Sequence, residues 1–247
     1  MNESTFHPIS AAFTQAGPRP PETASRAEKK NYAEALSRQL ATCIANALRK
    51  SFPGITPDPS GAHQEAPART SKGVKKLDIN YSTPQLGLGL GVSIKTLNFR
   101  DGRSRRYTKN FTRVDNELRA EAMDYHTRQP YAVLAGVVFL PMDACDDARA
   151  EPSSFGRAVQ LFRLRAGREK PVDVSELFES FHIALYDYAL MRSDPMSSET
   201  CIFFDALNAP PRARRPTRDE YYLFDEFVQQ VRFCYDRRNR PPVIWAD

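Results

Sequence analysis

Apolar and polar residues alternate along two neighbouring segments of the chain, residues 76–82 and 86–96. In the second segment the even positions carry leucine, valine, isoleucine and finally threonine, whereas the odd positions carry glycine, serine and lysine. A period of two sends successive side chains to opposite faces and is typical of half-buried β-strands. The two segments therefore predict a β-hairpin with one apolar face and one polar face.

The hairpin is expected to gather three polar residues on one face. A turn near Pro84 and Gln85 sets Asp78 opposite Ser93, and directly opposed residues of a hairpin share a face. Lys95 follows two positions after Ser93 and points the same way. The glycines at positions 87, 89 and 91 are expected to leave this face bare around the lysine.

The segments around the hairpin predict the rest of a core. A second helix is expected over residues 113–128, and the continuous apolar run 131–140 predicts a fully buried strand. Because strand–helix–strand crossovers are right-handed, strands 86–96 and 131–140 should be parallel. A first helix is expected over residues 27–50 from apolar residues at every fourth position: Tyr32, Leu36, Leu40, Ile44 and Leu48.

Residues outside this core have weaker patterns. Residues 1–27 are rich in Pro, Ser, Thr and Ala without periodicity and are expected to form a disordered N-terminal arm. Residues 53–73 contain several prolines and glycines and are expected to form a loop. The C-terminal part is expected to hold a short element, a helix, a strand and a long helix, at residues 155–165, 174–188, 200–204 and 218–237.

These elements predict an α/β fold with a central mixed β-sheet flanked by helices. We expect a single domain over residues 28–247, because a chain of 247 residues can bury a sizeable core without dividing. Within it, residues 28–141 would form the core and residues 142–247 a C-terminal helical extension.

The composition and charge of the chain limit the classes of protein to which it can belong. The longest apolar run, residues 131–140, is too short to span a bilayer, so no membrane association is expected. No secretory signal is visible at the N-terminus, and the four cysteines are widely separated, as expected of reduced thiols in the cytoplasm. The net charge of +5 and the pI of about 9.0 are compatible with a polyanionic partner.

Basic residues gather on both sides of the hairpin. Lysines at positions 75 and 76 precede Asp78, and four arginines follow Lys95 closely. Placed beside the polar face they would pair with DNA phosphates, whereas the alternative is that they only solvate loops. The candidate DNA-binding residues are Arg100, Arg103, Arg105, Arg106, Lys75 and Lys76.

The polar face has the residue types that metal-assisted phosphodiester cleavage requires. A carboxylate such as Asp78 holds a hard cation, and a neighbouring lysine such as Lys95 orients or helps to deprotonate the attacking water. Asp is disfavoured in strands, so its presence there points to a role. Ser93 would bind water or phosphate, or serve as a small polar filler.

The arrangement resembles the PD-(D/E)XK nuclease superfamily, which includes many restriction endonucleases. Its motif is an acidic residue on one strand and an acidic-x-Lys triplet on the next, matched here by Asp78 and Lys95. Ser93 stands where the triplet usually has an acid, and Leu77 stands where a proline often precedes the first acid. The resemblance covers residues 32 to 141 and includes restriction endonucleases with Ser-x-Lys that take the missing carboxylate from the following helix.

The resemblance implies a restriction-endonuclease-like core and a metal-dependent endonuclease of restriction or defence type. The expected cofactor is Mg²⁺ or Mn²⁺, the expected substrate is double-stranded DNA, and in-line attack would leave a 5′-phosphate. A homodimer or a partner subunit would suit paired cuts on a duplex. Glu34, on the first predicted helix, matches an additional acidic position of the superfamily, or else is a surface glutamate.

Two glutamates of the second helix are candidates for the displaced carboxylate. Glu117 and Glu121 lie one turn apart, and like charges at this spacing repel without a cation between them. Their neighbours have expected partners of their own, because Arg119 follows Asp115 by four residues and Arg128 follows Asp124 by four. Spacing does not choose between Glu117 and Glu121, so both join Asp78 as candidate metal ligands.

Two other functions stay open. Without an acid in the triplet, a nuclease-like fold would bind DNA without cutting it. Alternatively, the chain would be an interaction subunit of a defence complex, with the apolar C-terminal tail at residues 241–245 as its docking surface. Digestion of DNA with Mg²⁺ against a chelator control separates the nuclease from both alternatives.

Overall fold

The computed structural model describes residues 6–60, 66–148 and 152–239. Within them the helices are α1 (Pro8–Gln15), α2 (Arg26–Leu48), α3 (Phe111–Arg128), α4 (Ser154–Phe162), α5 (Tyr188–Ser193) and α6 (Phe224–Arg238). The strands are β1 (Ala66–Thr70), β2 (Gly73–Leu77), β3 (Ile79–Thr83), β4 (Gly87–Thr96), β5 (Val133–Pro141), β6 (Ser180–Tyr186), β7 (Cys201–Asp205) and β8 (Tyr221–Tyr222).

Six of the strands form one mixed sheet in the order β3-β4-β5-β6-β7-β8. β4, β5 and β6 are parallel, and the flanking pairs β3/β4, β6/β7 and β7/β8 are antiparallel. The predicted α/β class with a central mixed sheet is confirmed, as is the parallel pairing of β4 with β5 through α3. None of the helices in the described ranges is long and apolar enough to cross a membrane.

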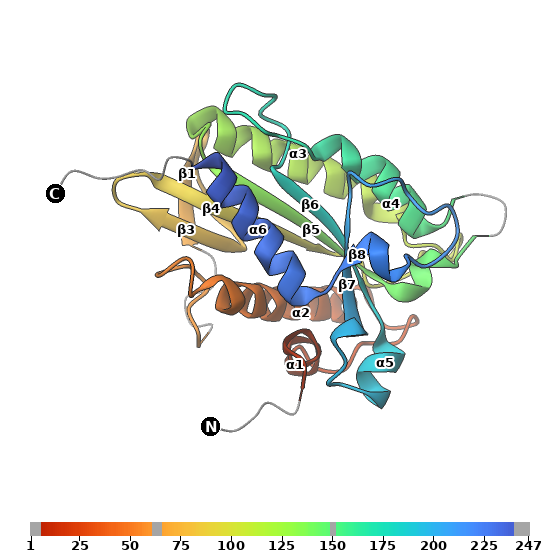
Figure 1. The fold of residues 1–247 in the computed structure, drawn as a ribbon. Helices are drawn as coiled ribbons and strands as arrows, with labels where there is room; N and C mark the ends of the chain where they lie inside the picture. Colours follow the sequence, from red (N-terminus) through yellow and green to blue (C-terminus); the bar gives the residue numbers. More distant parts are fainter. Residues whose placement is uncertain (1–5, 61–65, 149–151, 240–247) are drawn as a thin grey trace.

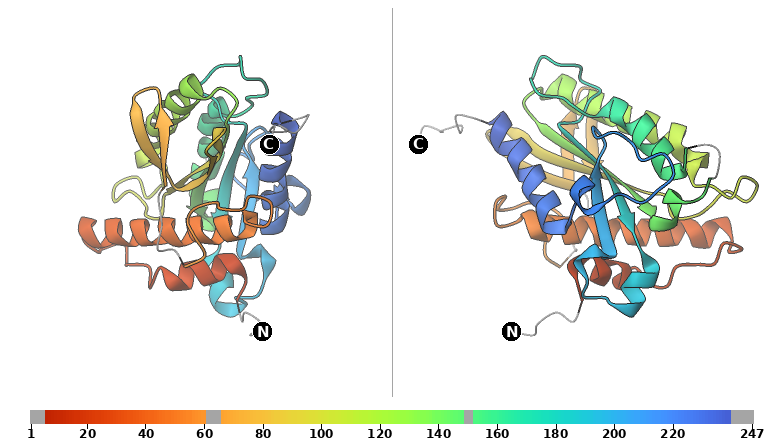
Figure 2. Two further views of the ribbon diagram at one scale, coloured as in Figure 1. Left: turned by 90° about the vertical axis from the view of Figure 1, so that its left-hand side faces the viewer. Right: turned by 45° about the vertical axis from the view of Figure 1, so that its right-hand side comes forward.

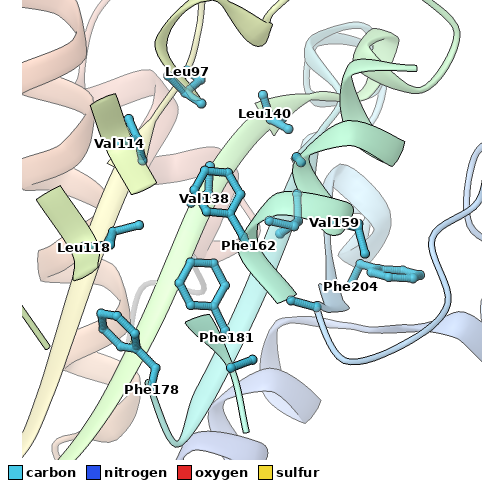
Figure 3. Close-up of a cluster of buried hydrophobic side chains, with 14 of the residues drawn as sticks. Leu97, Val114, Leu118, Val138, Leu140, Val159, Phe162, Phe178, Phe181 and Phe204 are labelled. Carbon is cyan, nitrogen blue, oxygen red and sulfur yellow. The ribbon is translucent and has the colours of Figure 1, made fainter. Parts of the chain in front are cut away.

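Helices cover both faces of the sheet (Figure 1). α3 and α4 pack on one face, where Leu118 and Phe162 meet residues of β5 and β6. Figure 3 shows part of this cluster, in which the rings of Phe162 and Phe181 stack. α1, α2 and α6 cover the opposite face, where Leu40 and Phe227 lie in the second cluster. Figure 2 shows α2 and α3 separated by the sheet.

The first long helix forms where the apolar period predicts it. α2 begins after Ser25, whose side chain accepts a hydrogen bond from the backbone N–H of Glu28 while Glu28 bonds back to the Ser25 N–H. This reciprocal capping box fixes the start of the helix. The predicted stripe from Tyr32 to Leu48 is buried against the sheet.

The predicted disordered arm is wrong for residues 8–15, which form α1. Ile9, Ala12 and Phe13 occupy one face of this helix and are buried, and the Ser10 hydroxyl donates to Thr200. Three apolar residues at helical spacing are enough for a two-turn helix when α2 covers them. The composition of the surrounding segment concealed this short pattern.

Part of the predicted C-terminal helical extension is also wrong. Residues 180–186 form strand β6, although a helix was predicted over 174–188. Every residue of β6 is buried, and an apolar run that is buried on both faces has no period that separates a strand from a helix. The long helix begins at Phe224 rather than at 218, since Tyr221 and Tyr222 form β8 at the end of the sheet.

The predicted strand over residues 76–82 is broken at Asp78. β2 ends at Leu77 and pairs with β1, which lies in the predicted loop, so these two strands form a separate small sheet. Consequently Leu77 faces the α3 side, whereas Ile79 faces the α2 side. The apolar alternation of β4 also shifts at Gly89, which has no partner in β3 because of a β-bulge.

The glycines of β4 are not bare, which corrects the expected open polar face. Gly91 is covered by Leu77 and Leu134, and Gly87 is covered by Gln129. Absence of a side chain here lets neighbouring side chains approach the strand closely.

Replacing Gly91 with alanine is expected to lower the free energy of unfolding by about 1–3 kcal/mol, the usual cost of overpacking a core. The added Cβ would lie 2.7 Å from Leu77 Cδ1 and 2.9 Å from Leu134 Cδ2. Gly102→Ala is the control, because a Cβ there meets no atom within 4 Å. Urea unfolding of both variants checks the prediction, and equal stability would contradict close packing at Gly91.

Candidate functional site

The candidate site lies where β3 and β4 part. The pairing of these strands begins at Ile79 and Val92, and in the described part of the chain no strand pairs with β4 on this side beyond Val92. Asp78 immediately precedes this pairing and accepts a hydrogen bond at Oδ2 from the backbone N–H of Ile94 at 2.6 Å. The carboxylate is therefore fixed to the strand that carries Ser93 and Lys95.

The other carboxylates of the site come from α3. The Ser93 hydroxyl donates to Glu121 Oε1 at 2.5 Å, and Lys95 Nζ lies 3.7 Å from Glu121 Oε2. Lys95 Nζ also lies 3.9 Å from Glu117 Oε2. Both glutamates that were predicted as candidates thus face the strand rather than solvent on the far side of α3.

The two glutamates differ in burial and in partners. The Glu121 side chain is 16% exposed, whereas the Glu117 side chain is 41% exposed. Glu117 is also bound by Arg113, one turn earlier, at 2.5 Å. Glu121 is therefore the inner carboxylate, and Glu117 lies at the rim.

A cleft of about 610 Å³ opens in front of this edge of β4. The predicted Glu34 lies in its wall on α2, where it pairs with Lys30 at 3.5 Å. Charged residues that line the cleft come from α2, the β4 edge and α3, and are Lys30, Glu34, Arg38, Asp78, Lys95, Arg113 and Glu117. The wall therefore carries charges of both signs.

Sequence reasoning missed the cations of this cleft on α2. Lys30, Glu34 and Arg38 recur at intervals of four residues, so they share one face of the helix. Arg38 is exposed and forms no ion pair within the described residues. The helical spacing was a usable signal, but the sequence does not show that this face looks toward Lys95.

Tyr125 is a second residue that the sequence analysis overlooked at this site. It follows Glu121 by one helical turn, it is fully buried, and its hydroxyl has no hydrogen-bond partner in the described ranges. Burial raises the pKa of the phenol, and the negative charges of Glu121, Asp124 and Asp78 raise it further. The hydroxyl therefore stays protonated and is an available donor close to these carboxylates.

The predicted lysines lie away from the cleft on the small sheet. Lys75 and Lys72 both bind Asp124, so the expected pairing of Asp124 with Arg128 is wrong. Burial would raise the pKa of Asp124, but hydrogen bonds from the two lysines outweigh it, and the pKa is lowered. Lys76 is exposed on β2.

The expected pair of Asp115 with Arg119 is also replaced. Arg165 binds Asp115 at 2.7 Å, and Arg119 binds Glu176 at 2.7 Å. Both partners come from the segment between α4 and β6, so contacts across elements override the local spacing of four residues.

The predicted arginines follow β4 but none of them lines the cleft with Lys95. Arg100 binds Asp143 at 2.6 Å, and Arg106 donates to the carbonyl oxygen of Pro152. Arg103 and Arg105 are exposed on the same loop. The four side chains are therefore not a single cluster beside the candidate site.

The donors at the site suit a hard cation. Across residues 6–60, 66–148 and 152–239, no group of three or more His, Cys, Asp or Glu side chains converges to hold a metal ion. Mg²⁺, however, is usually bound through one or two carboxylates and keeps several waters. Asp78 and Glu121 bind the neighbouring residues Ile94 and Ser93 of β4, so two carboxylates with oxygen ligands approach the same segment of the strand. This set fits Mg²⁺ or Mn²⁺.

Comparison with known proteins adds no relative to this geometry. No family model matches the chain, and neither the curated proteins nor the solved structures give a match. The function must therefore be argued from the site itself.

Proposed function

We propose that this protein is a metal-dependent endonuclease of restriction or defence type that hydrolyses phosphodiester bonds of double-stranded DNA. One observation carries the proposal. Asp78, the Ser93–Lys95 segment and Glu121 come from three separate elements and meet at the unpaired edge of β4. Asp78 is bound to the backbone of the strand that carries Lys95, and Lys95 pairs with Glu121. An acid, a lysine and a second acid are the residue types that the resemblance requires, with Glu121 in place of the acid that Ser93 replaces.

The order of the elements supports the same proposal. A helix, an antiparallel pair of strands, a second helix and a parallel strand follow one another as α2, β3, β4, α3 and β5. This is the order that the resemblance implies for a restriction-endonuclease-like core. β6, β7 and β8 extend the sheet beyond that core.

The residues have distinct roles in the proposed reaction. Asp78 and Glu121 would hold Mg²⁺ or Mn²⁺, which when bound would stabilise the charge that develops on the phosphoryl oxygens. Lys95, with its ammonium group at the cleft wall, orients the attacking water. Ser93 positions Glu121 through its hydroxyl and has no separate chemical task.

The cleft wall suits a polyanion. Lys30 and Arg38 of α2 and Arg113 of α3 approach the β4 edge from two sides. Cations in this position would neutralise phosphates next to the scissile bond. They replace the arginines after β4 as the phosphate contacts closest to the cut.

The alternative of an interaction subunit depends on the apolar tail at residues 241–245, which lies outside the described residues. The alternative of a DNA-binding protein without activity is tested by the first experiment below.

Asp78→Ala and Lys95→Ala are each expected to reduce DNA cleavage at least about 100-fold and to leave DNA binding largely intact, since each removes a group that acts in the chemical step. Nicking and linearisation of plasmid DNA with Mg²⁺, against a chelator control, gives the measurement. Lys170→Ala and Asp194→Ala are matched controls, because they remove the same charges at exposed positions outside the cleft.

Cleavage by either site variant at the rate of the wild type would refute these roles. Binding of DNA by the wild-type protein with no cleavage under any metal condition would make it a DNA-binding protein.

The choice between the two glutamates gives a second prediction. Glu121→Gln keeps an acceptor for the Ser93 hydroxyl but loses the charge, so the Mg²⁺ concentration for half-maximal cleavage should rise at least about tenfold. Glu117→Gln removes a carboxylate that lies at the rim and is 41% exposed, and should change this concentration much less. A Mg²⁺ titration of both variants distinguishes them. A larger effect of Glu117→Gln would reverse the assignment.

A further inference from the structure

A second cleft of about 520 Å³ lies beyond the candidate site, where the chain leaves β4. Four arginines from separate places in the sequence line it: Arg19, Arg100, Arg105 and Arg215. Three carboxylates, those of Glu22, Asp143 and Asp187, also line it, so the wall carries one more cation than anions. We call it the arginine cleft.

The four arginines are not equally committed to partners. Arg19 binds Glu22 and Arg100 binds Asp143, each at 2.6 Å. Arg215 is 55% exposed and lies 3.5 Å from Asp187 and 3.7 Å from Asp146, two long and solvent-screened pairs. Arg105 forms no side-chain ion pair within the described residues. Two arginines are thus fixed in the wall, and two are able to bind a ligand.

The backbone at Arg105 supports a role in binding. Its φ is +58°, and among the described residues it is the one amino acid other than glycine with positive φ. This conformation costs stability in a residue with a Cβ, and such strain concentrates at functional positions. The strain persists because Asp101 holds the turn, accepting hydrogen bonds from the backbone N–H groups of Arg103 and Ser104.

The buried tyrosine hydroxyls that line the cleft already donate hydrogen bonds within the protein, so the arginines must supply the hydrogen-bond donors to a ligand. Tyr107 and Tyr186 are buried there, and their hydroxyls already donate to Asp143 and Asn98. The planar fork of arginine matches the paired oxygens of a phosphate group.

The arginine cleft is adjacent to the candidate site. Thr96 lines the first cleft and Arg100 lines the second, so their Cα atoms are at most about 14 Å apart. Arg19 also donates to the carbonyl oxygen of Asn98, within the connecting segment. One strand of duplex DNA advances about 3.4 Å per phosphate, so this separation corresponds to about four nucleotides or fewer.

From these observations we infer that the arginine cleft binds a phosphate group through Arg105 and Arg215. Given the proposed function, on which this part rests, that phosphate belongs to the backbone of the DNA strand on one side of the cut. The cleft would therefore fix the register of the DNA strand on the enzyme, while Asp78 and Lys95 act on the bond.

The test compares the wild type with Arg105→Gly/Arg215→Ala and with Arg157→Ala/Arg163→Ala. The control pair removes the same charge from exposed positions that line neither cleft. Binding of a labelled 20-base-pair duplex is measured by fluorescence anisotropy with a chelator present, at several salt concentrations. The cleft variant should bind at least about tenfold more weakly, and its salt slope should fall by about 0.9, the value for one lost phosphate contact.

Thermal unfolding with inorganic phosphate is a second experiment, and it does not depend on DNA. Millimolar phosphate should raise the thermal midpoint of the wild type and of the control pair more than that of the cleft variant. The single variant Arg105→Gly should not lower the thermal midpoint without ligand, because glycine relieves the positive φ. If Arg105 only stabilised the fold, Arg105→Gly would have a lower thermal midpoint than the wild type.

The outcomes separate the two proposals. If the cleft variant matches the control pair with both DNA and phosphate, the arginine cleft is not a binding site, whatever the cleavage activity. If phosphate distinguishes the variants but the wild type neither binds nor cuts DNA, the anion site stands and the nuclease proposal fails. If both arms distinguish the variants, the cleft holds a backbone phosphate.

Discussion

The divergence of β3 from β4 is the constraint on which the candidate site depends. Where a strand loses its neighbour, its backbone N–H groups need another acceptor. Asp78 provides one by accepting from Ile94, so the carboxylate is positioned by the main chain of the strand that presents Ser93 and Lys95. An acid and a lysine on one rigid frame keep their geometry better than groups placed on loops.

The helices on the two faces complete this frame and also stabilise it. α3 contributes Glu121 to the site, and its apolar residues, including Leu118, form the core on that face. α2 contributes the opposite wall of the cleft while its stripe packs on β4. Changes in core packing on either face of the sheet would therefore alter the positions of the site residues. Gly91 is an example, since the side chain that covers it belongs to Leu77, the neighbour of Asp78.

Local periodicity was sufficient to predict much of this site. Alternation in β4 placed Ser93 and Lys95 on one face, and the fourfold spacing of α3 set Glu121 and Glu117 on one side of the helix. The predictions that failed concerned features that depend on contacts between residues far apart in the sequence. β6 is buried on both faces and has no period to detect. The loop arginines take partners such as Asp143, which is distant in sequence, so charge clustering did not reveal their direction.

The unpaired edge of β4 also limits how two copies of this chain could associate. An exposed strand edge invites a strand from another molecule, and a charged side chain there opposes such pairing. Lys95 stands at this edge with a quarter of its side chain exposed, so a neighbouring strand would have to strip water from its ammonium group. Sheet extension through this edge would also close the cleft. Two copies of the proposed nuclease that acted together on a duplex would therefore have to meet through other surfaces, which would leave the two edges free to face the DNA.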